Sequence, residues 1–185
     1  SVLLPLYFEG AYGMTALVAG LLILPAIACN AVTSIVGGRV MDARGAWPLL
    51  PVGFALIAVG QIAISVTAAS MNIGVVVALT VVVYAGVGLV LSPSQTAGLE
   101  TLPAAEHPHG TALLNTWNMI AASFGPSLFI GLLSSSAVAA GAAGVASDVA
   151  QAIGFAAAVR VAAVIAVVGF AVSLVYARRE SHMSH

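Results

Sequence analysis

The stretch "VGGRVMDARGAWPLL", residues 36–50, differs from the rest of the chain in its charge and in its turn-forming residues. It holds two arginines, one aspartate, three glycines and one proline within fifteen residues. The segments on either side consist almost entirely of Val, Leu, Ile and Ala. Because glycine and proline favour turns, the stretch predicts a short, charged connection between two apolar segments.

The composition of the whole chain limits its class. Of 185 residues, 61% are hydrophobic and 6% are charged, and the mean hydropathy is +1.12. A soluble domain usually carries about 25% charged residues, so most of this chain is expected to lie in membrane lipid. The net charge is −1 and lysine is absent, which excludes the basic surface that a nucleic-acid partner needs.

The sequence holds no arrangement that predicts catalysis or a cofactor. Cys29 is the single cysteine, so neither a disulfide framework nor a zinc site follows from it. His107 and His109 have a spacing that occurs in metal sites, but two histidines in a proline-containing loop more often serve structural roles. We found no nucleophile–base pair and no phosphate-binding loop, so we expect no enzyme, no cofactor and no metal.

Five apolar runs are long enough to span a membrane, which takes about 20 residues. They cover residues 15–40, 48–68, 73–99, 109–136 and 151–177. Residues 1–12 read as the end of a truncated span with an outer loop, and the small residues 137–150 as a second outer loop. The expected fold is an all-α integral membrane protein with five complete transmembrane helices plus the end of a sixth. The chain is expected to be part of a longer protein.

The distribution of arginine predicts the orientation in the membrane. Successive loops alternate between the two sides, so residues 41–47, 100–108 and 178–185 share one side. With Arg39 at the adjoining end of the first run, that side holds four of the five arginines. By the positive-inside rule it faces the cytoplasm. The sequence therefore predicts a multi-pass protein of the cell inner membrane, in contact with lipid, with a cytoplasmic C-terminus.

The charged connection follows the pattern Gly38-Arg39-x-x-Asp42-x-x-Gly45-x-x-Pro48. This pattern resembles the cytoplasmic loop signature of the major facilitator superfamily, which joins the second and third helices of each six-helix half. Ala43 occupies the place of the usual basic residue, and Arg44 follows it. The resemblance implies a cytoplasmic gating loop formed by Gly38, Arg39, Asp42, Arg44 and Gly45. The alternative is an ordinary turn that happens to carry charges.

A second stretch of sequence resembles one branch of this superfamily. Residues 93–116 contain Pro93, Gln95, Thr96, Ala97, Leu99, Leu102 and Pro103, followed by His109, Gly110, Ala112, Asn115 and Thr116. This pattern is similar to that of the drug:H+ antiporters with fourteen spans, although Asn118-Met119 replaces their usual Arg-Gln pair. The resemblance implies the C-terminal half of a proton-coupled exporter of small lipophilic compounds. The partner of this half would be the missing N-terminal half of the same transporter.

Polar residues recur along three of the apolar runs at steps of three and four, which place them on one helix face. Polar groups within lipid are expected to face the bundle interior or a water-filled cavity. The resemblance places the first, third and fourth runs near the central pathway and the other two outside it. The predicted substrate pathway consists of Asn30, Thr80, Tyr84, Ser92, Gln95, Thr111, Asn115 and Asn118. The alternative is that these groups only form hydrogen bonds between helices, worth about 0.6 kcal/mol each.

Other residues inside the runs have two interpretations as well. Pro25, Pro93 and Pro126 mark moving segments of a transporter or static kinks. Gly53 and Gly60 predict close helix packing. Arg160 either extends its long side chain to the outer membrane interface or contacts a substrate.

Acidic residues are absent from the interiors of the runs. Proton coupling generally uses an acid or a histidine within the membrane, so we expect the proton carrier in the missing half. Two other functions remain open at this point. One is a transporter of a polar metabolite, and the other is a half-size protein that assembles into a membrane channel or scaffold.

Overall fold

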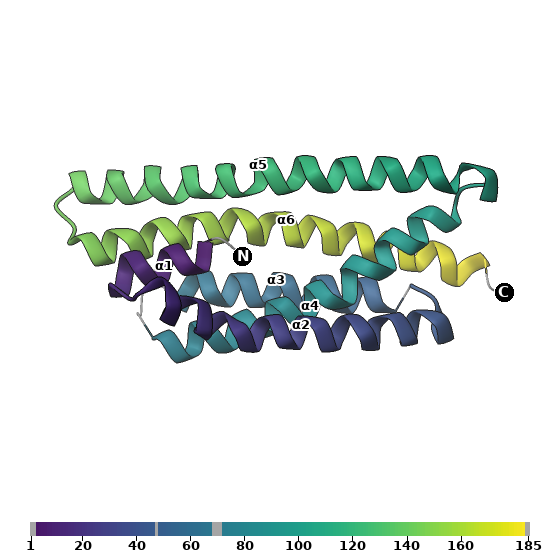
Figure 1. Cartoon of the computed structure of the whole chain (residues 1–185), viewed down its shortest axis with the longest axis horizontal. Helices are drawn as coiled ribbons and strands as arrows, with labels where there is room; N and C mark the ends of the chain where they lie inside the picture. The colour runs from purple at the N-terminus through teal and green to yellow at the C-terminus, as the bar shows by residue number, and fades with distance from the viewer. Residues whose placement is uncertain (1–2, 47, 68–71, 184–185) are drawn as a thin grey trace.

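The computed structural model describes residues 3–46, 48–67 and 72–183, and in these residues the chain forms helices and no strands. Figure 1 shows them as a bundle of long helices lying roughly along one direction. In chain order they are α1 (Leu3–Tyr12), α2 (Ala16–Arg44), α3 (Leu49–Thr67), α4 (Ile73–Glu100), the short η2 (Ala104–Glu106), α5 (His107–Ala142) and α6 (Ser147–Met183).

Helices α2 to α6 have the length and the apolar composition of membrane-spanning segments. Their apolar residues surround each helix instead of forming one stripe, as expected for helices that contact lipid on one side and protein on the other. Helix α1 has 10 residues, which is about half of a span. The predicted all-α fold with five complete spans is therefore confirmed, and α1 lies where the end of a sixth span was expected.

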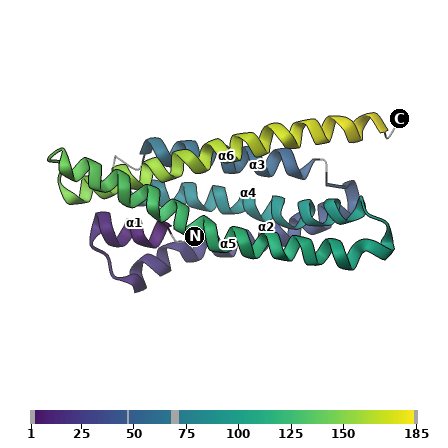
Figure 2. The same ribbon diagram turned by 90° about the horizontal axis from the view of Figure 1, so that it is seen from above.

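The long helices pack in an order that differs from their order in the chain. Helix α2 packs on α4, α4 on α3, α3 on α6 and α6 on α5. Figure 2 shows α3 and α6 along one side of the bundle and α2 and α5 along the other, with α4 between them. Helix α1 lies across one end, against α6 and α2. Consequently α5 has one main neighbour, and much of its surface is open.

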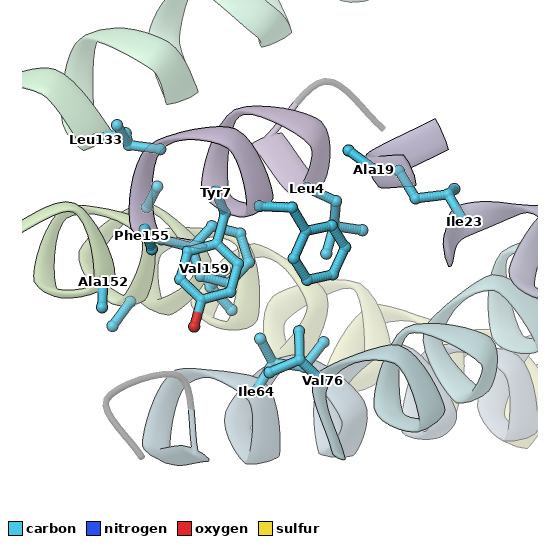
Figure 3. Close-up of a cluster of buried hydrophobic side chains, with 14 of the residues drawn as sticks. Leu4, Tyr7, Ala19, Ile23, Ile64, Val76, Leu133, Ala152, Phe155 and Val159 are labelled. Carbon is cyan, nitrogen blue, oxygen red and sulfur yellow. The ribbon is translucent and has the colours of Figure 1, made fainter. Parts of the chain in front are cut away.

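The main buried cluster joins α1 to α6 and to the ends of α3 and α4 nearest to it. The rings of Tyr7 and Phe155 stack with their centroids 4.1 Å apart. Ile64 and Val76 face them from α3 and α4 (Figure 3). Tyr7, Phe8 and Phe155 are almost completely buried. The short α1 is therefore anchored in the bundle by its aromatic side chains.

Glycine allows α3 and α4 to approach closely. A Cβ atom placed on Gly86 of α4 would lie 2.6 Å from the carbonyl oxygen of Gly53. A Cβ atom on Gly60 would lie 2.6 Å from a methyl group of Val83. Neither distance is compatible with a side chain, so the predicted role of Gly53 and Gly60 in close packing is confirmed.

The charged connection is shorter than the sequence predicted. Helix α2 continues to Arg44, whereas we expected it to end at Val40 and the loop to cover residues 41–47. The helix ends at Gly45, which has a φ of 79°. That backbone conformation favours glycine. The prediction was wrong because polar residues at the end of a helix can extend beyond the apolar layer without breaking the helix.

The last two helices are also longer than expected. Helix α5 covers His107–Ala142 instead of 109–136, and α6 covers Ser147–Met183 instead of 151–177. The outer loop predicted over residues 137–150 is thus reduced to residues 143–146. Alanine has the highest intrinsic helix propensity, so the alanine-rich segment that we interpreted as a loop extends α5. Residues 1, 2, 47, 68–71, 184 and 185 of the predicted segments lie outside the described residues.

Candidate functional site

The predicted polar faces of α2 and α4 pack against each other. The side-chain Nδ2 of Asn30 donates a hydrogen bond of 3.0 Å to the carbonyl oxygen of Tyr84. At the same level, a Cβ atom on Gly88 would lie 2.7 Å from the carbonyl oxygen of Asn30 and 3.0 Å from the nitrogen of Ser34. Asn30 therefore serves a contact between helices, which is the alternative that the sequence left open for it.

A small cavity lies beside this contact, between α1, α3, α4 and α6. Its volume is about 90 Å³, and its polar lining comes from Gln61, Thr80 and Tyr84. Liquid water occupies about 30 Å³ per molecule, so the cavity has room for a few waters. Sites for drug-sized ligands have volumes of roughly 300–1,000 Å³. The cavity therefore does not hold such a ligand in this structure.

Two predicted pathway residues, Thr80 and Tyr84, line this cavity. Thr80 is 3% exposed, and its hydroxyl donates to the carbonyl oxygen of Val76 at 2.7 Å. Gln61, which our sequence interpretation missed, completes the polar lining from α3. We had placed α3 outside the pathway by resemblance. The available clue was that Gln61 is the one amide side chain within that apolar run.

The other two predicted residues of α4 lie nearer to its C-terminal end. Ser92 is exposed, and Gln95 is partly exposed. Ser92 accepts a hydrogen bond from Thr96 through its carbonyl oxygen, at 3.3 Å. The predicted polar face of α4 is thus buried around Thr80 and open around Ser92. Pro93 directly follows Ser92 inside a continuous helix, and Pro25 and Pro126 likewise lie inside α2 and α5.

The polar residues of α5 are open. Thr111, Asn115 and Asn118 are all exposed, and the Thr111 hydroxyl donates to the carbonyl oxygen of His107 at 2.8 Å. Eleven residues make about three helical turns, so the face of Asn118 is shared by Phe129. Phe129 packs against the main buried cluster. The three polar residues therefore lie on the side of α5 that faces the bundle.

These residues are exposed because the start of α5 lies apart from the neighbouring helices. In Figure 2, α5 and α6 lie together near the connection that joins them and separate toward the start of α5. Helices α4 and α5 pack on each other little, mainly near the segment that connects them. The first half of α5 thus has few contacts with α4, and Thr111, Asn115 and Asn118 are exposed on it.

The residues of the predicted gating loop lie together at the end of α2. Arg39, Asp42 and Arg44 are exposed, and Gly38 is partly exposed. Gly45 occupies the turn that ends the helix. We see no ion pair of Asp42 with any of the residues that the structure describes. The charged residues therefore lie together at the end of α2, but Asp42 forms no ion pair with any described residue.

The remaining candidate residues have local roles or none that the structure defines. His107 begins α5, and its Nε2 lies 3.1 Å from the carbonyl oxygen of Leu102. Within residues 3–46, 48–67 and 72–183, no three His, Cys, Asp or Glu side chains are grouped for metal binding. Arg160 lies within α6 and is exposed.

Comparison with known proteins establishes the family. The sequence model of the Major Facilitator Superfamily matches residues 1–126. The chain belongs to the Major Facilitator Superfamily. The predicted superfamily is thereby confirmed, and the all-helical fold with five candidate spans is consistent with half of such a transporter.

Individual relatives agree with this family. The chain is 34% identical to the uncharacterised MFS-type transporter YcnB of Bacillus subtilis over 171 residues, which cover 92% of this chain and 36% of YcnB. It is 32% identical to the lincomycin resistance protein LmrB of Listeria monocytogenes over 133 residues, which cover 72% of this chain and 28% of LmrB. The chain thus spans about a third of the length of these relatives. No solved structure matches it.

Proposed function

We propose that this chain is the C-terminal six-helix half of a transporter that exports small lipophilic compounds by alternating access. The observation that carries the proposal is the open polar face of α5. Asparagine side chains within a membrane-spanning helix are costly in lipid, and Asn115 and Asn118 are exposed on the bundle side of α5. A water-filled pathway satisfies both of these amides.

The chemistry of this face suits compounds with a large apolar part and a few polar groups. Leu114 lies on the same helix face as Asn118, and Trp117 and Met119 lie on the flanks of that face. Small-molecule sites commonly combine apolar walls with a few hydrogen-bonding groups. The name of one relative, a lincomycin resistance protein, supports a drug of this kind as the cargo.

The proposal includes the parts of the protein that lie beyond these 185 residues. The opposing N-terminal half closes the pathway and carries the acidic residue that couples export to protons, as in the fourteen-span drug:H+ antiporters that the sequence resembles. The protein lies in the inner membrane with Arg39, Asp42 and Arg44 at the cytoplasmic side. There the charged end of α2 makes and breaks contacts as the two halves rock.

Drug susceptibility tests the proposal directly. The full-length protein would be expressed in a bacterial strain that lacks its major efflux pumps, and growth inhibition by lincomycin and by a panel of amphipathic drugs would be measured. We expect resistance to at least one drug, and we expect the double substitution Asn115→Leu/Asn118→Leu to abolish it. The matched control is Thr116→Val, because Thr116 lies on another side of the same exposed helix.

Membrane abundance of each variant would be measured by immunoblot, so that loss of protein is not mistaken for loss of export. Full resistance in the double variant at equal abundance would contradict the role of α5. Absence of resistance to every drug with the unmodified protein would contradict the exporter.

A further inference from the structure

The small cavity between α1, α3, α4 and α6 is separate from the polar face of α5. Its lining residues come from those four helices, and its volume is about 90 Å³. The apolar walls include Leu4, Ile64 and Phe155, and Figure 3 shows Leu4 and Phe155 across from Ile64. All three belong to the main buried cluster. The walls are therefore held in place by the packing of the bundle itself.

Gln61 brings an amide to this cavity from α3. Gln61 and Ile64 both line the cavity, and their spacing of three places them on one helix face. With the residues that the structure describes, the Gln61 side chain forms no hydrogen bond. Every buried side-chain nitrogen or oxygen among those residues has a hydrogen-bond partner. The Gln61 amide is therefore accessible to a water molecule at the cavity that it lines.

Thr80 brings a hydroxyl to the same cavity from α4. Thr80 is buried, and its hydroxyl donates to the carbonyl oxygen of Val76 at 2.7 Å. A hydroxyl that donates one hydrogen bond still has lone pairs that accept, and a glutamine amide has two N–H donors and one acceptor. Donors on α3 and an acceptor on α4 thus line one cavity.

The size of the cavity matches water better than any larger ligand. Liquid water occupies about 30 Å³ per molecule, and a buried water needs two to four polar partners. Gln61, Thr80 and Tyr84 are the polar residues of the lining. An apolar occupant would leave the Gln61 amide without a hydrogen bond, which is unfavourable away from water. The polar lining therefore selects a polar occupant of very small size.

Water has a short path to this cavity from one end of the bundle. Helix α3 ends at Thr67, six residues after Gln61, which is about 9 Å at 1.5 Å per residue. Helix α4 begins at Ile73, seven residues before Thr80, which is about 10 Å. The cavity thus lies close to the ends of both helices, and an occupant from the aqueous phase need not cross the middle of the membrane.

We propose that this cavity binds a cluster of about three ordered waters that bridges α3 to α4. One water accepts a hydrogen bond from the Gln61 amide and donates to the Thr80 oxygen, and the others extend the cluster to Tyr84. A bridging water is nearly as favourable in enthalpy as a direct hydrogen bond. The cluster lies beside the contact of Gly60 with Val83, so Gln61 joins the same two helices through water.

Hydroxyl-radical footprinting tests the proposal. A short X-ray pulse splits water, and the radicals oxidise side chains beside each water molecule before they diffuse away. The full-length protein in detergent would be irradiated, and oxidation would be mapped by mass spectrometry. Phe155 and Phe8 form a matched pair, since each is 1% exposed and Phe155 lines the cavity whereas Phe8 does not. We expect Phe155 to be oxidised about five-fold faster than Phe8 or more, because buried water is a fixed part of the structure.

Two substitutions remove the polar groups that hold the waters. Gln61→Leu replaces the amide with hydrocarbon of similar size, and we expect Phe155 oxidation to fall to the rate of Phe8. Thr80→Val keeps the shape of the side chain and should lower Phe155 oxidation in the same direction. The matched control is Ile62→Leu, because Ile62 is exposed on the same helix and lies outside the cavity lining. This variant should keep the rate of the unmodified protein.

Equal oxidation of Phe155 and Phe8 in the unmodified protein would overturn the proposal, because protein or lipid would then fill the cavity. Fast oxidation of Phe155 that persists in both Gln61→Leu and Thr80→Val would overturn it too, since water would enter without binding to these groups. The Phe155–Phe8 comparison needs no variant, so it decides the proposal where a substitution prevents folding. None of these measurements depends on drug export, so the water site and the exporter can fail separately.

Discussion

Helices α4 and α5 carry similar polar residues at similar spacing, but the surroundings of these residues differ. Thr80 of α4 is 3% exposed, and Thr111 of α5 is exposed. Both hydroxyls donate to the carbonyl oxygen four residues earlier, at 2.7 and 2.8 Å. The local bonding is thus the same, and the difference lies in what packs beside each helix.

The packing of α4 depends on glycines that touch neighbouring helices, whereas the glycines in the middle of α5 touch none. Gly86 and Gly88 bring the backbone of α4 against α3 and α2, whereas Cβ atoms on Gly125 and Gly131 of α5 would meet nothing within 4 Å. A small residue allows close helix approach only where a second helix is present to use it. Helix α4 is therefore packed closely between other helices of this chain, whereas much of the surface of α5 is exposed.

The largest expected effect comes from filling the α2–α4 contact. Gly88→Leu would place a Cβ atom 2.7 Å from the carbonyl oxygen of Asn30, which is backbone and cannot move aside. Overpacking usually costs about 1–3 kcal/mol and occasionally more, and a clash with backbone belongs to the upper part of this range. We expect the full-length variant to be nearly absent from the membrane by immunoblot.

The same change on α5, Gly131→Leu, serves as the comparison and should leave abundance unchanged. If the two variants accumulated equally, α4 would not have the packing described here. If Gly131→Leu were lost as well, the face of α5 at that position would be covered in the full-length protein.

The contrast between these helices also shows what the sequence could predict. Runs of apolar residues predicted the number of spans, because lipid requires about 20 such residues per crossing whatever the helix contacts. Gly53 and Gly60 predicted a close contact correctly, since few other roles suit glycine inside a span. The positions of helix ends were predicted less well, because the Ala- and Ser-rich residues after 136 are compatible with both helix and loop.

The candidate site shows the same limit of sequence reasoning. Spacing placed Asn30 and Asn115 on polar faces, but it cannot show whether a second helix covers that face. In the structure, Asn30 bonds to Tyr84 of α4, and Asn115 is exposed. Gln61 was missed because a single amide has no periodic partner within its own helix. Its role depends on α1, α4 and α6, which supply the other walls of the cavity.

The reactivity of introduced cysteines would test whether α4 is buried at Thr80 and α5 is accessible at Thr111. Thr80→Cys and Thr111→Cys change the same side chain in the same local bonding, in a background where Cys29, the one cysteine of this chain, is replaced by alanine. We expect a membrane-impermeant thiol reagent to label Thr111→Cys at least about ten-fold faster, because a buried thiol is inert. The rates would be measured by mass spectrometry on the full-length protein in vesicles with the reagent on both sides.

A substrate that occupies the proposed pathway adds a second readout. It should slow labelling of Thr111→Cys and leave the slow labelling of Thr80→Cys unaltered. Equal rates for the two cysteines in the absence of substrate would mean that another part of the protein covers α5, and its polar face would not line a pathway.

The smallest expected effect concerns the two asparagines. Asn30→Ala removes a hydrogen bond between helices, and such bonds contribute about 0.6 kcal/mol on average within membrane proteins. For a unit of this size that loss corresponds to a decrease in thermal midpoint of roughly 1–2 °C, measured on the full-length protein in detergent. Asn115→Ala removes no helix–helix bond and should leave the midpoint unchanged while export falls. An equal loss of stability in Asn115→Ala would show that its amide also joins two helices, and the polar faces of α4 and α5 would then have the same role.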